Sequence, residues 1–327
     1  MRFHRRELLR LAAGGAALPF ISSFAAAHTN STRPVRILVG FPAGGPVDIA
    51  ARLIAPWLSA RLGQPFAVEN LPGESGNRAA EAVVRAPPDG STLLLCGPVN
   101  TINTTLFRHL TFNFTRDIAP VASLFRVPLV LEVNPRVAAR TVPEFLALAR
   151  ARPGRIRVGY AGRGTPQHIG IEMFKLMAGV DLTLVPYLGS PPALTDLLSG
   201  QVDAMFDPLP SSIAHIRRGA LLPLAVTSRD RSEALPNVPS MSDFIPGYEA
   251  GSWFGIGAPR DTPEGVIRRL NDAVNAGLGD LSIRARLADL GGTATARSPG
   301  EFASFIAEET DRFAELIRIA AITAEQG

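Results

Sequence analysis

Residues 35–52 read VRILVGFPAGGPVDIAAR, and this stretch predicts a buried strand, a glycine turn and the start of a helix. Residues 35–39 are mostly β-branched or aliphatic, as in a strand of a parallel sheet. Gly44 and Gly45 allow close approach of a ligand to the backbone, and the fixed φ of Pro46 suits a first helical turn. A strand that leads directly into a helix points free N–H groups and a partial positive charge at one place. The sequence therefore predicts an anion-binding turn at residues 41–48.

Asp48 allows two interpretations. A carboxylate in the first turn of a helix is stabilised by the helix dipole, so Asp48 can be a cap residue. It can also contact a ligand or a water molecule. The expected effect of Asp48→Ala separates the two, because loss of a ligand contact weakens binding more than it lowers the melting temperature.

The first part of the chain alternates strands with helices, which indicates a parallel sheet covered by helices. We expect strands at residues 35–39, 66–70 and 91–96, and helices at residues 47–62 and 78–85. In such sheets ligands lie beyond the carboxyl ends of the strands. The loops at residues 41–48, 71–78 and 97–103 meet this condition, and they contain Phe41, Ala43, Arg78, Asn100 and Thr101 as candidate ligand contacts.

The second part of the chain repeats this arrangement. A long apolar segment at residues 118–133 predicts a crossover, and residues 248–258 predict the return. Between them we expect strands at residues 155–160, 182–187, 202–206 and 222–227. Helices at residues 263–278, 282–290 and 299–321 close the chain. The predicted fold is two α/β lobes, residues 33–124 plus 247–327 and residues 125–246.

A second glycine turn lies at residues 161–168, AGRGTPQH. Backbone N–H groups of Gly162, Arg163 and Gly164, with the hydroxyl of Thr165, are candidates to hold a carboxylate; the alternative is an unoccupied structural turn. The turn resembles half of a dinucleotide fingerprint, but Gln167 stands where the third glycine would fall. No lysine follows either glycine loop as in a phosphate-binding loop, so we expect no cofactor.

Other polar residues have spacings that could suit catalysis or metal binding. His168 and Glu172 have the i,i+4 spacing of a helical pair, but no third and fourth metal ligand follows at a readable spacing. His168 stays a candidate cleft residue. Asp203 and Asp207 flank a strand too far apart for paired carboxylate chemistry; Asp207 at the carboxyl end could reach the cleft, and Asp203 is expected to be structural. We predict neither a catalytic nor a metal site.

Length, charge and the first residues narrow the class further. A chain of 327 residues exceeds one ordinary core, which favours two domains. Residues 1–27 read as an export signal, with Arg5 and Arg6 typical of either a Sec or a twin-arginine leader. The signal carries four arginines and one glutamate, so its removal near Ala27 lowers the formal charge from +4 to +1. With no long basic run left, nucleic acid is not expected. Cys96 follows an apolar run and is expected to be a buried thiol.

Several motifs, in order along the chain, resemble one known family. They are FPAGGPVDIAAR at residues 41–52, ENLPGESGN at residues 69–77, PDGSTLL at residues 88–94, PALTDLLSGQVD at residues 192–203, LAVTS at residues 224–228, LPNVP at residues 235–239 and SWFG at residues 252–255. The chain thereby resembles solute-binding proteins of the tripartite tricarboxylate transporter type, the Bug family. It departs from the family at Ala161 and Arg163, where serine-rich turns are usual, and at Leu188, where a basic residue usually follows the tyrosine.

The resemblance implies a type II periplasmic binding protein fold with two hinge crossovers. It implies a monomeric, periplasmic receptor that captures a small organic carboxylate and delivers it to large and small membrane subunits of a transporter. Signalling to a membrane sensor kinase and exported hydrolysis are the alternatives. The expected ligand-binding residues are Phe41, Ala43, Gly44, Gly45, Asp48, Arg78, Asn100, Thr101, Gly162, Arg163, Gly164, Thr165, His168 and Asp207.

Overall fold

Strands and helices alternate along the chain in a computed structural model that describes residues 33–107 and 109–323. The strands are β1 (Val35–Val39), β2 (Phe66–Asn70), β3 (Thr92–Cys96), β4 (Ile118–Val133), β5 (Arg157–Tyr160), β6 (Thr183–Pro186), β7 (Ala204–Pro208), β8 (Leu222–Val226), β9 (Gly251–Pro259) and β10 (Thr293–Ala294). The α-helices are α1 (Pro46–Leu62), α2 (Asn77–Val84), α3 (Pro98–Leu106), α4 (Phe114–Asp117), α5 (Val142–Ala151), α6 (Pro166–Ala178), α7 (Ser190–Ser199), α8 (Leu209–Arg217), α9 (Glu264–Gly279), α10 (Leu281–Asp289) and α11 (Pro299–Ile319). Two 3₁₀ turns, Glu74–Gly76 and Met241–Asp243, complete the described elements.

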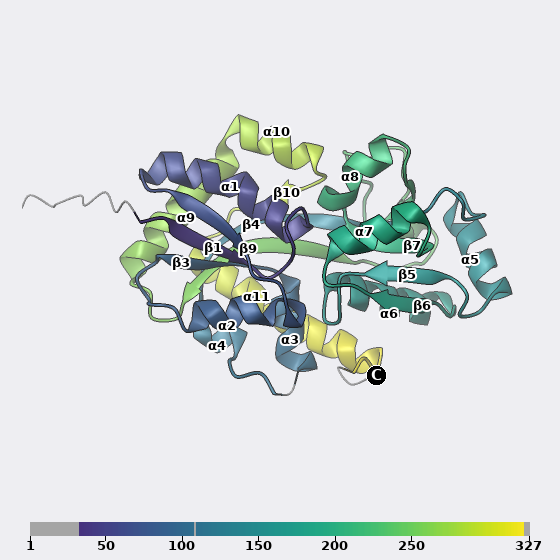
Figure 1. The fold of residues 1–327 in the computed structure, drawn as a ribbon, viewed down its shortest axis with the longest axis horizontal. Helices are drawn as coiled ribbons and strands as arrows, with labels where there is room; N and C mark the ends of the chain where they lie inside the picture. The colour runs from purple at the N-terminus through teal and green to yellow at the C-terminus, as the bar shows by residue number, and fades with distance from the viewer. Residues whose placement is uncertain (1–32, 108, 324–327) are drawn as a thin grey trace, which may run out of the picture. The chain divides into compact units, whose positions relative to one another are not determined.

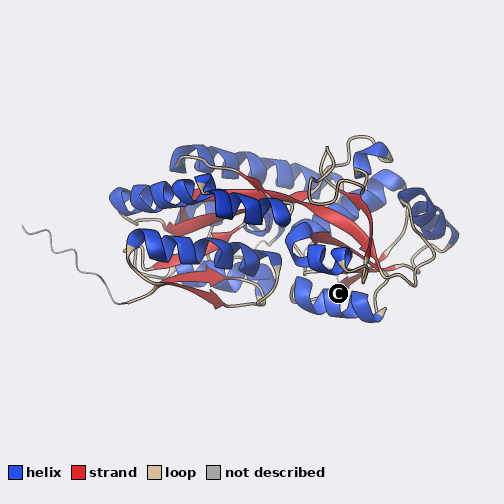
Figure 2. Ribbon diagram, turned by 90° about the horizontal axis from the view of Figure 1, so that it is seen from above, coloured by secondary structure: helices blue, strands red, loops and turns tan. Residues whose placement is uncertain are grey.

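The sheet consists of two halves with the same strand order. In the first half the order is β2-β1-β3-β9, with β1 parallel to β2 and β3, and β9 antiparallel to β3. In the second half β6, β5 and β7 are parallel in the same sense, and β4 is antiparallel to β7. Helices flank both halves, as Figures 1 and 2 show. This is the predicted fold, two α/β lobes joined by crossing strands.

Each half has a hydrophobic cluster on both faces of its strands. On β1, Ile37 belongs to the cluster under α1 and α9, whereas Leu38 belongs to the cluster on the other face, under α2 and α11. On β4, Leu129 and Val130 face opposite clusters of the second half in the same way. Burying each such side chain stabilises the fold by about 1.5–3 kcal/mol. Strands buried on both faces explain why the sequence shows continuous apolar runs rather than alternation.

The long strand β4 passes from one half to the other. It pairs with β9 as far as Pro128 opposite Gly251, and from Leu129 onward it pairs with β7 and β8. At this point the buried hydroxyl of Thr227 lies 2.8 Å from the backbone N–H of Leu129, which donates to it, and 2.6 Å from the carbonyl of Ala250. One side chain therefore ties both crossing segments together.

Most predicted elements are present with small shifts, and one loop prediction was wrong. Residues 97–103 were expected to form a loop, but α3 begins at Pro98. The β-branched residues Val99, Thr101 and Ile102 concealed the helix, since they lower helix propensity. The prediction of a buried thiol is confirmed, because Cys96 is 1% exposed and burial raises its pKa to about 12.

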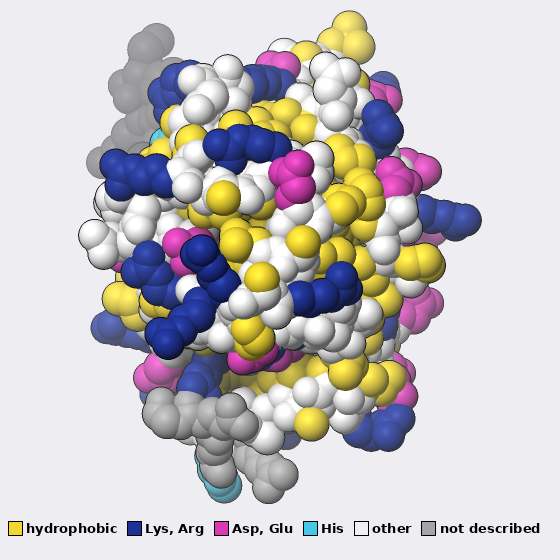
Figure 3. All heavy atoms as spheres, turned by 90° about the vertical axis from the view of Figure 1, so that its right-hand side faces the viewer, with side chains coloured by type: hydrophobic (Ala, Val, Ile, Leu, Met, Phe, Trp, Pro, Cys, Tyr) yellow, Lys and Arg dark blue, Asp and Glu magenta, His cyan; other side chains and the backbone are white. Residues whose placement is uncertain are grey.

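At the surface, basic, acidic and hydrophobic side chains are mixed on the face that Figure 3 shows, at the end of the second half. Within the described residues, no helix is both long and apolar enough to cross a membrane. The predicted signal at residues 1–27 lies outside the described residues.

Candidate functional site

A cavity lies where the segments that follow β1, β2, β3, β5 and β6 meet. Its lining comes from both halves and from the crossing strand β9: Gly40, Phe41, Gly45, Pro46, Val47, Gly76, Leu94, Leu95, Gly97, Pro98, Val99, Asn100, Ala161, Thr165, Pro166, Gln167, Ser190, Pro208, Ser252 and Phe254. The volume open to the centres of water-sized molecules is ≈ 40 Å³, equivalent to about three water molecules. The cavity is therefore small, and residues of both halves form its walls.

Four helices begin at the cavity. Their first residues Pro46 of α1, Pro98 of α3, Pro166 of α6 and Ser190 of α7 all line it. The first N–H groups of a helix have no partner within the helix, and the dipole makes this end attractive to anions. None of the residues that line the cavity carries a charged side chain. The site therefore offers backbone dipoles and neutral polar groups to an anion.

The lining residues of the first half, here called the first wall, include a side-chain amide with a free N–H donor. Asn100, 5% exposed, lies in the first turn of α3, and its Oδ1 accepts a hydrogen bond of 3.0 Å from the N–H of Gly97. Its Nδ2 donates to no other group within the part of the chain that the structure describes, and it is not enclosed by protein atoms. This donor is therefore available to a molecule in the cavity.

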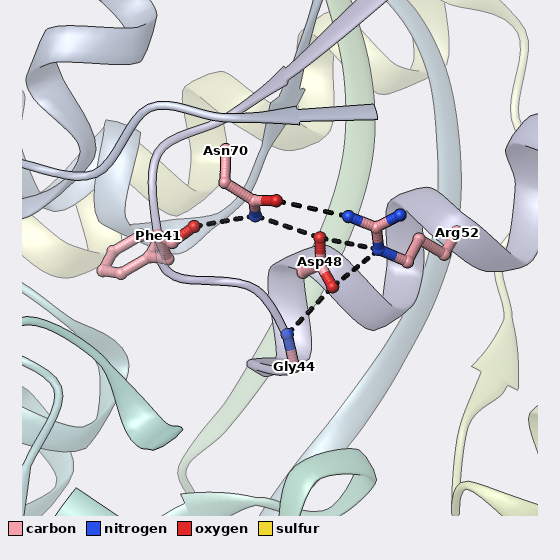
Figure 4. A network of polar contacts seen from close by, with 5 residues as sticks. All are labelled: Phe41, Gly44, Asp48, Arg52 and Asn70. Carbon is pink, nitrogen blue, oxygen red and sulfur yellow. Dashed lines mark hydrogen bonds and ion pairs between the residues drawn. The ribbon is translucent and has the colours of Figure 1, made fainter. Parts of the chain in front are cut away.

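The carboxylate of Asp48 stabilises the loop after β1 by hydrogen bonds, as Figure 4 shows. Its carboxylate accepts hydrogen bonds from the N–H of Gly44 at 2.9 Å, from Asn70 Nδ2 at 3.0 Å and from Arg52 Nε at 2.9 Å. Asn70 also donates to the carbonyl of Phe41. Burial acts to raise the pKa of Asp48, but the bonds from Arg52, Gly44 and Asn70 outweigh it, and the pKa lies below its usual value. Asp48 thus orders the turn and does not line the cavity.

His168 braces the loop after β5 in a similar way. Its Nδ1 accepts a hydrogen bond of 3.4 Å from the N–H of Gly164, and its ring stacks on Tyr160 with 5.2 Å between centroids. Burial, with the nearby charges of Arg163 and Lys175, lowers the pKa of His168 to about 4. The imidazole is therefore neutral at pH 7, as an accepting Nδ1 requires.

A buried carboxylate lies behind the second-half wall. Asp207, fully buried on β7, accepts hydrogen bonds from Ser190 Oγ at 2.5 Å and Gln167 Nε2 at 2.6 Å. Ser211 and Ser212 at the start of α8 donate to its other oxygen. Burial raises the pKa of Asp207, although these four donors act to lower it. Asp207 therefore holds two lining residues in place without lining the cavity itself.

The structure divides the predicted site residues into two groups. Phe41, Gly45, Asn100 and Thr165 line the cavity. Those that do not line it are Ala43, Gly44, Asp48, Arg78, Thr101, Gly162, Arg163, Gly164, His168 and Asp207, and for them ligand contact stays a prediction. Arg78 is exposed, and Thr101 Oγ1 donates to the carbonyl of Pro98.

Sequence reasoning missed Gln167, Ser190 and Ser252 as lining residues. The positions of Gln167 and Ser190, in the first turn of a helix after a glycine turn, could have marked them. Asp203 bonds the N–H of Arg157 at 2.8 Å, which confirms its structural role. Glu172 forms an ion pair with Lys175 at 3.2 Å.

The described geometry defines a class, the two-lobed binding proteins that hold a small molecule between α/β halves. Comparison with known proteins gives the family: residues 50–322 match the model of the tripartite tricarboxylate transporter family receptor. The chain is 34% identical over 312 residues to protein BugT of Bordetella pertussis, covering 94% of each chain. This protein belongs to that receptor family.

Two solved structures are similar over most of their length. R. palustris Rpa4515 with adipate has 37% identity and a TM-score of 0.87, and the match covers 90% of this chain and 99% of that one. MatC from Rhodopseudomonas palustris with bound malate has 32% identity and a TM-score of 0.83, covering 88% and 99%.

Proposed function

We propose that the protein is a periplasmic receptor that captures a small organic carboxylate in the cavity between its lobes. The observation that carries this proposal is the convergence of four helix N-termini on a cavity without charged lining side chains. Each hydrogen bond from such a donor to a carboxylate is worth about 1.5–3 kcal/mol. Similarity to proteins solved with adipate and with malate supports the same ligand class.

Capture proceeds by movement of the lobes about the crossing segments. We assign residues 33–124 plus 247–327 to one lobe and residues 125–246 to the other. The change of strand pairing between Pro128 and Leu129 and the bonds of Thr227 support a bending point there. The lining of the cavity supports this proposal, because it comes from both halves and movement of the halves would open or close the site.

The proposal includes export and delivery. Residues 1–27 direct the chain across the cytoplasmic membrane and are cleaved near Ala27, and the mature monomer then passes its ligand to the membrane subunits of a tripartite tricarboxylate-type transporter. Membership of the receptor family supports this partner. Binding is the whole chemical task in this account, and no covalent step is assigned to the site.

The experiment is thermal denaturation of the mature chain, unfolded and refolded to remove carried-over ligand, with a panel of mono-, di- and tricarboxylates. A ligand at a hundred times its dissociation constant adds about 2.7 kcal/mol to the free energy of unfolding. A shift confined to one class of carboxylate supports the proposal and identifies the ligand class. A transition that no carboxylate moves contradicts it.

A further inference from the structure

The polar side chains of the second half that line the cavity are here called the second wall: Thr165, Gln167 and Ser190. Their hydrogen-bond donors already bond other groups of the protein. Ser190 has one hydroxyl proton, which it donates to Asp207 Oδ1, and Gln167 Nε2 donates to Asp207 and, at 2.9 Å, to Ser190 Oγ. Thr165 donates its only hydroxyl proton to the carbonyl of Gly162 at 2.7 Å. These side chains therefore have no hydrogen-bond donor left for a ligand. The oxygen atoms of Ser190 and Thr165 keep lone pairs that can accept.

The hydrogen bonds from Ser190 and Gln167 depend on an ionised Asp207. The neighbouring Glu132 explains why Asp207 stays ionised. Glu132 is fully buried on β4, and its Oε1 lies 2.6 Å from Ser212 Oγ, which in turn lies 3.0 Å from Asp207 Oδ2. Its Oε2 has no partner among the described residues. A protonated Glu132 donating to Ser212, with Ser212 donating to Asp207, satisfies every hydroxyl in this chain. Two buried carboxyl groups so close share one proton, and the four donors around Asp207 leave that proton on Glu132.

The opposite wall has the complementary character. There Asn100 Nδ2 is free, and the starts of α1 and α3 add backbone N–H groups, of which those of Val47 and Val99 lie in lining residues. An anion is favoured at this wall over the second one, where the accepting side chains oppose the first N–H groups of α6 and α7. At the second wall the side chains accept, and the negative charge of Asp207 lies one hydrogen bond behind them.

We infer that the ligand is a carboxylate whose chain carries a hydrogen-bond donor, a hydroxyl or an ammonium group, which binds Ser190 Oγ while a carboxylate binds the wall of Asn100. Asp207 is the positioning residue, because it takes the proton of Ser190 and so turns that hydroxyl into an acceptor. This inference rests on the proposed function and narrows its ligand class.

The test is isothermal titration of the refolded mature protein with ligands matched in chain length. The sets are succinate, malate and aspartate; glutarate, 2-hydroxyglutarate and glutamate; and adipate, 2-hydroxyadipate and 2-aminoadipate. In the chain length that binds most tightly, the hydroxy or amino member is expected to bind about tenfold or more tightly than the plain diacid. A plain diacid that binds as tightly overturns the inference but leaves the proposed function intact. Binding of none of the nine overturns the inference, and the proposed function is overturned only if the wider carboxylate panel fails as well.

Three variants test the role of the proton acceptor. Ser190→Ala removes the accepting oxygen and should reduce the preference to less than about threefold, mainly by weakening the substituted ligand. Asp207→Ala releases the protons of Ser190 and Gln167 and should likewise abolish the preference, whereas Asp207→Asn keeps an accepting oxygen and should retain it. The matched control is Ser211→Ala, which removes another hydroxyl bonded to Asp207 away from the cavity lining and should leave the preference unchanged.

The ratio of affinities distinguishes positioning from a merely structural role, because a loss of stability weakens all ligands alike. If Asp207→Ala does not fold, Ser190→Ala alone decides the matter. A preference that survives Ser190→Ala, or that Ser211→Ala reduces as strongly, overturns the assignment.

Discussion

The loops after β1 and β5 share one hydrogen-bonding pattern of the backbone, but different side chains complete it. In the first, Gly44 has a φ of 81° and its N–H bonds the side chain four residues on, Asp48; in the second, Gly164 has a φ of 70° and its N–H bonds His168 in the same way. A proline at the first helical position follows in both loops. The loops differ in charge, since one of these side chains is an ionised carboxylate and the other a neutral imidazole. The fold therefore positions the backbone N–H donors of both loops. Asp48 and His168 determine how each loop responds to pH and to the ligand.

The largest expected effect is that of a charge on the first wall. Asn100→Asp keeps the oxygen that caps Gly97 but replaces the free amide donor by a negative charge. Titration of the tightest carboxylate should show at least a hundredfold loss of affinity, about 2.7 kcal/mol, with the melting temperature of the apo protein little changed. Affinity retained within threefold contradicts the placement of the anion at this wall.

The second largest effect is expected from replacing Asp48, which stabilises the loop after β1. Asp48→Asn places an amide donor against the donors of Arg52, Asn70 and Gly44 and should lower the free energy of unfolding by about 2 kcal/mol at pH 7. Because the folded pKa of Asp48 is depressed, this contribution is present above the unfolded pKa near 3.9 and is lost as the pH falls through the folded value. Urea denaturation at pH 7 and pH 3 checks this. A difference as large at pH 3 as at pH 7 contradicts a contribution from the charge of Asp48.

His168, which stabilises the loop after β5, changes the free energy of unfolding at higher pH than Asp48 does. A lowered histidine pKa means that the unfolded chain binds a proton first, so His168 costs stability as the pH falls from about 6.5 towards 4. Wild type should lose about 1–2 kcal/mol between pH 7 and pH 5 through this group, and His168→Gln should abolish that part of the loss. His109→Gln, at an exposed position, serves as the control. Parallel curves for wild type and His168→Gln contradict a neutral buried imidazole.

A matched glycine pair gives the smallest effect. Both glycines have positive φ, but a Cβ at Gly44 meets nothing within 4 Å, whereas a Cβ at Gly164 lies 2.2 Å from Asn103 Oδ1 on the opposite half. Gly164→Ala should therefore hold the walls apart and weaken ligand binding about tenfold, some 1.4 kcal/mol, beyond the effect of Gly44→Ala. Equal losses in the two variants show that backbone strain alone is responsible.

Local patterns predicted the architecture well because each strand and turn carries its own signal. The strands at residues 35–39 and 66–70 and the crossover at residues 118–133 have the predicted bounds. Long-range contacts could not be predicted in this way. Glu132 is a single acidic residue within the apolar run of β4, and only the packing of α8 against that strand brings it to Ser212. Sequence spacing likewise places Asp207 at a strand end but does not show that its carboxylate lies behind the lining residues Ser190 and Gln167.

The placement of the ligand between the two walls is tested by a crystal structure of the refolded protein with the carboxylate that binds it most tightly. We predict a carboxylate within hydrogen-bond distance of Asn100 Nδ2 and the N–H groups that begin α1 and α3, and a hydroxyl or ammonium group on Ser190 Oγ. A ligand held outside this cavity, or one whose carboxylate instead contacts the side chains of Ser190 and Gln167, contradicts it.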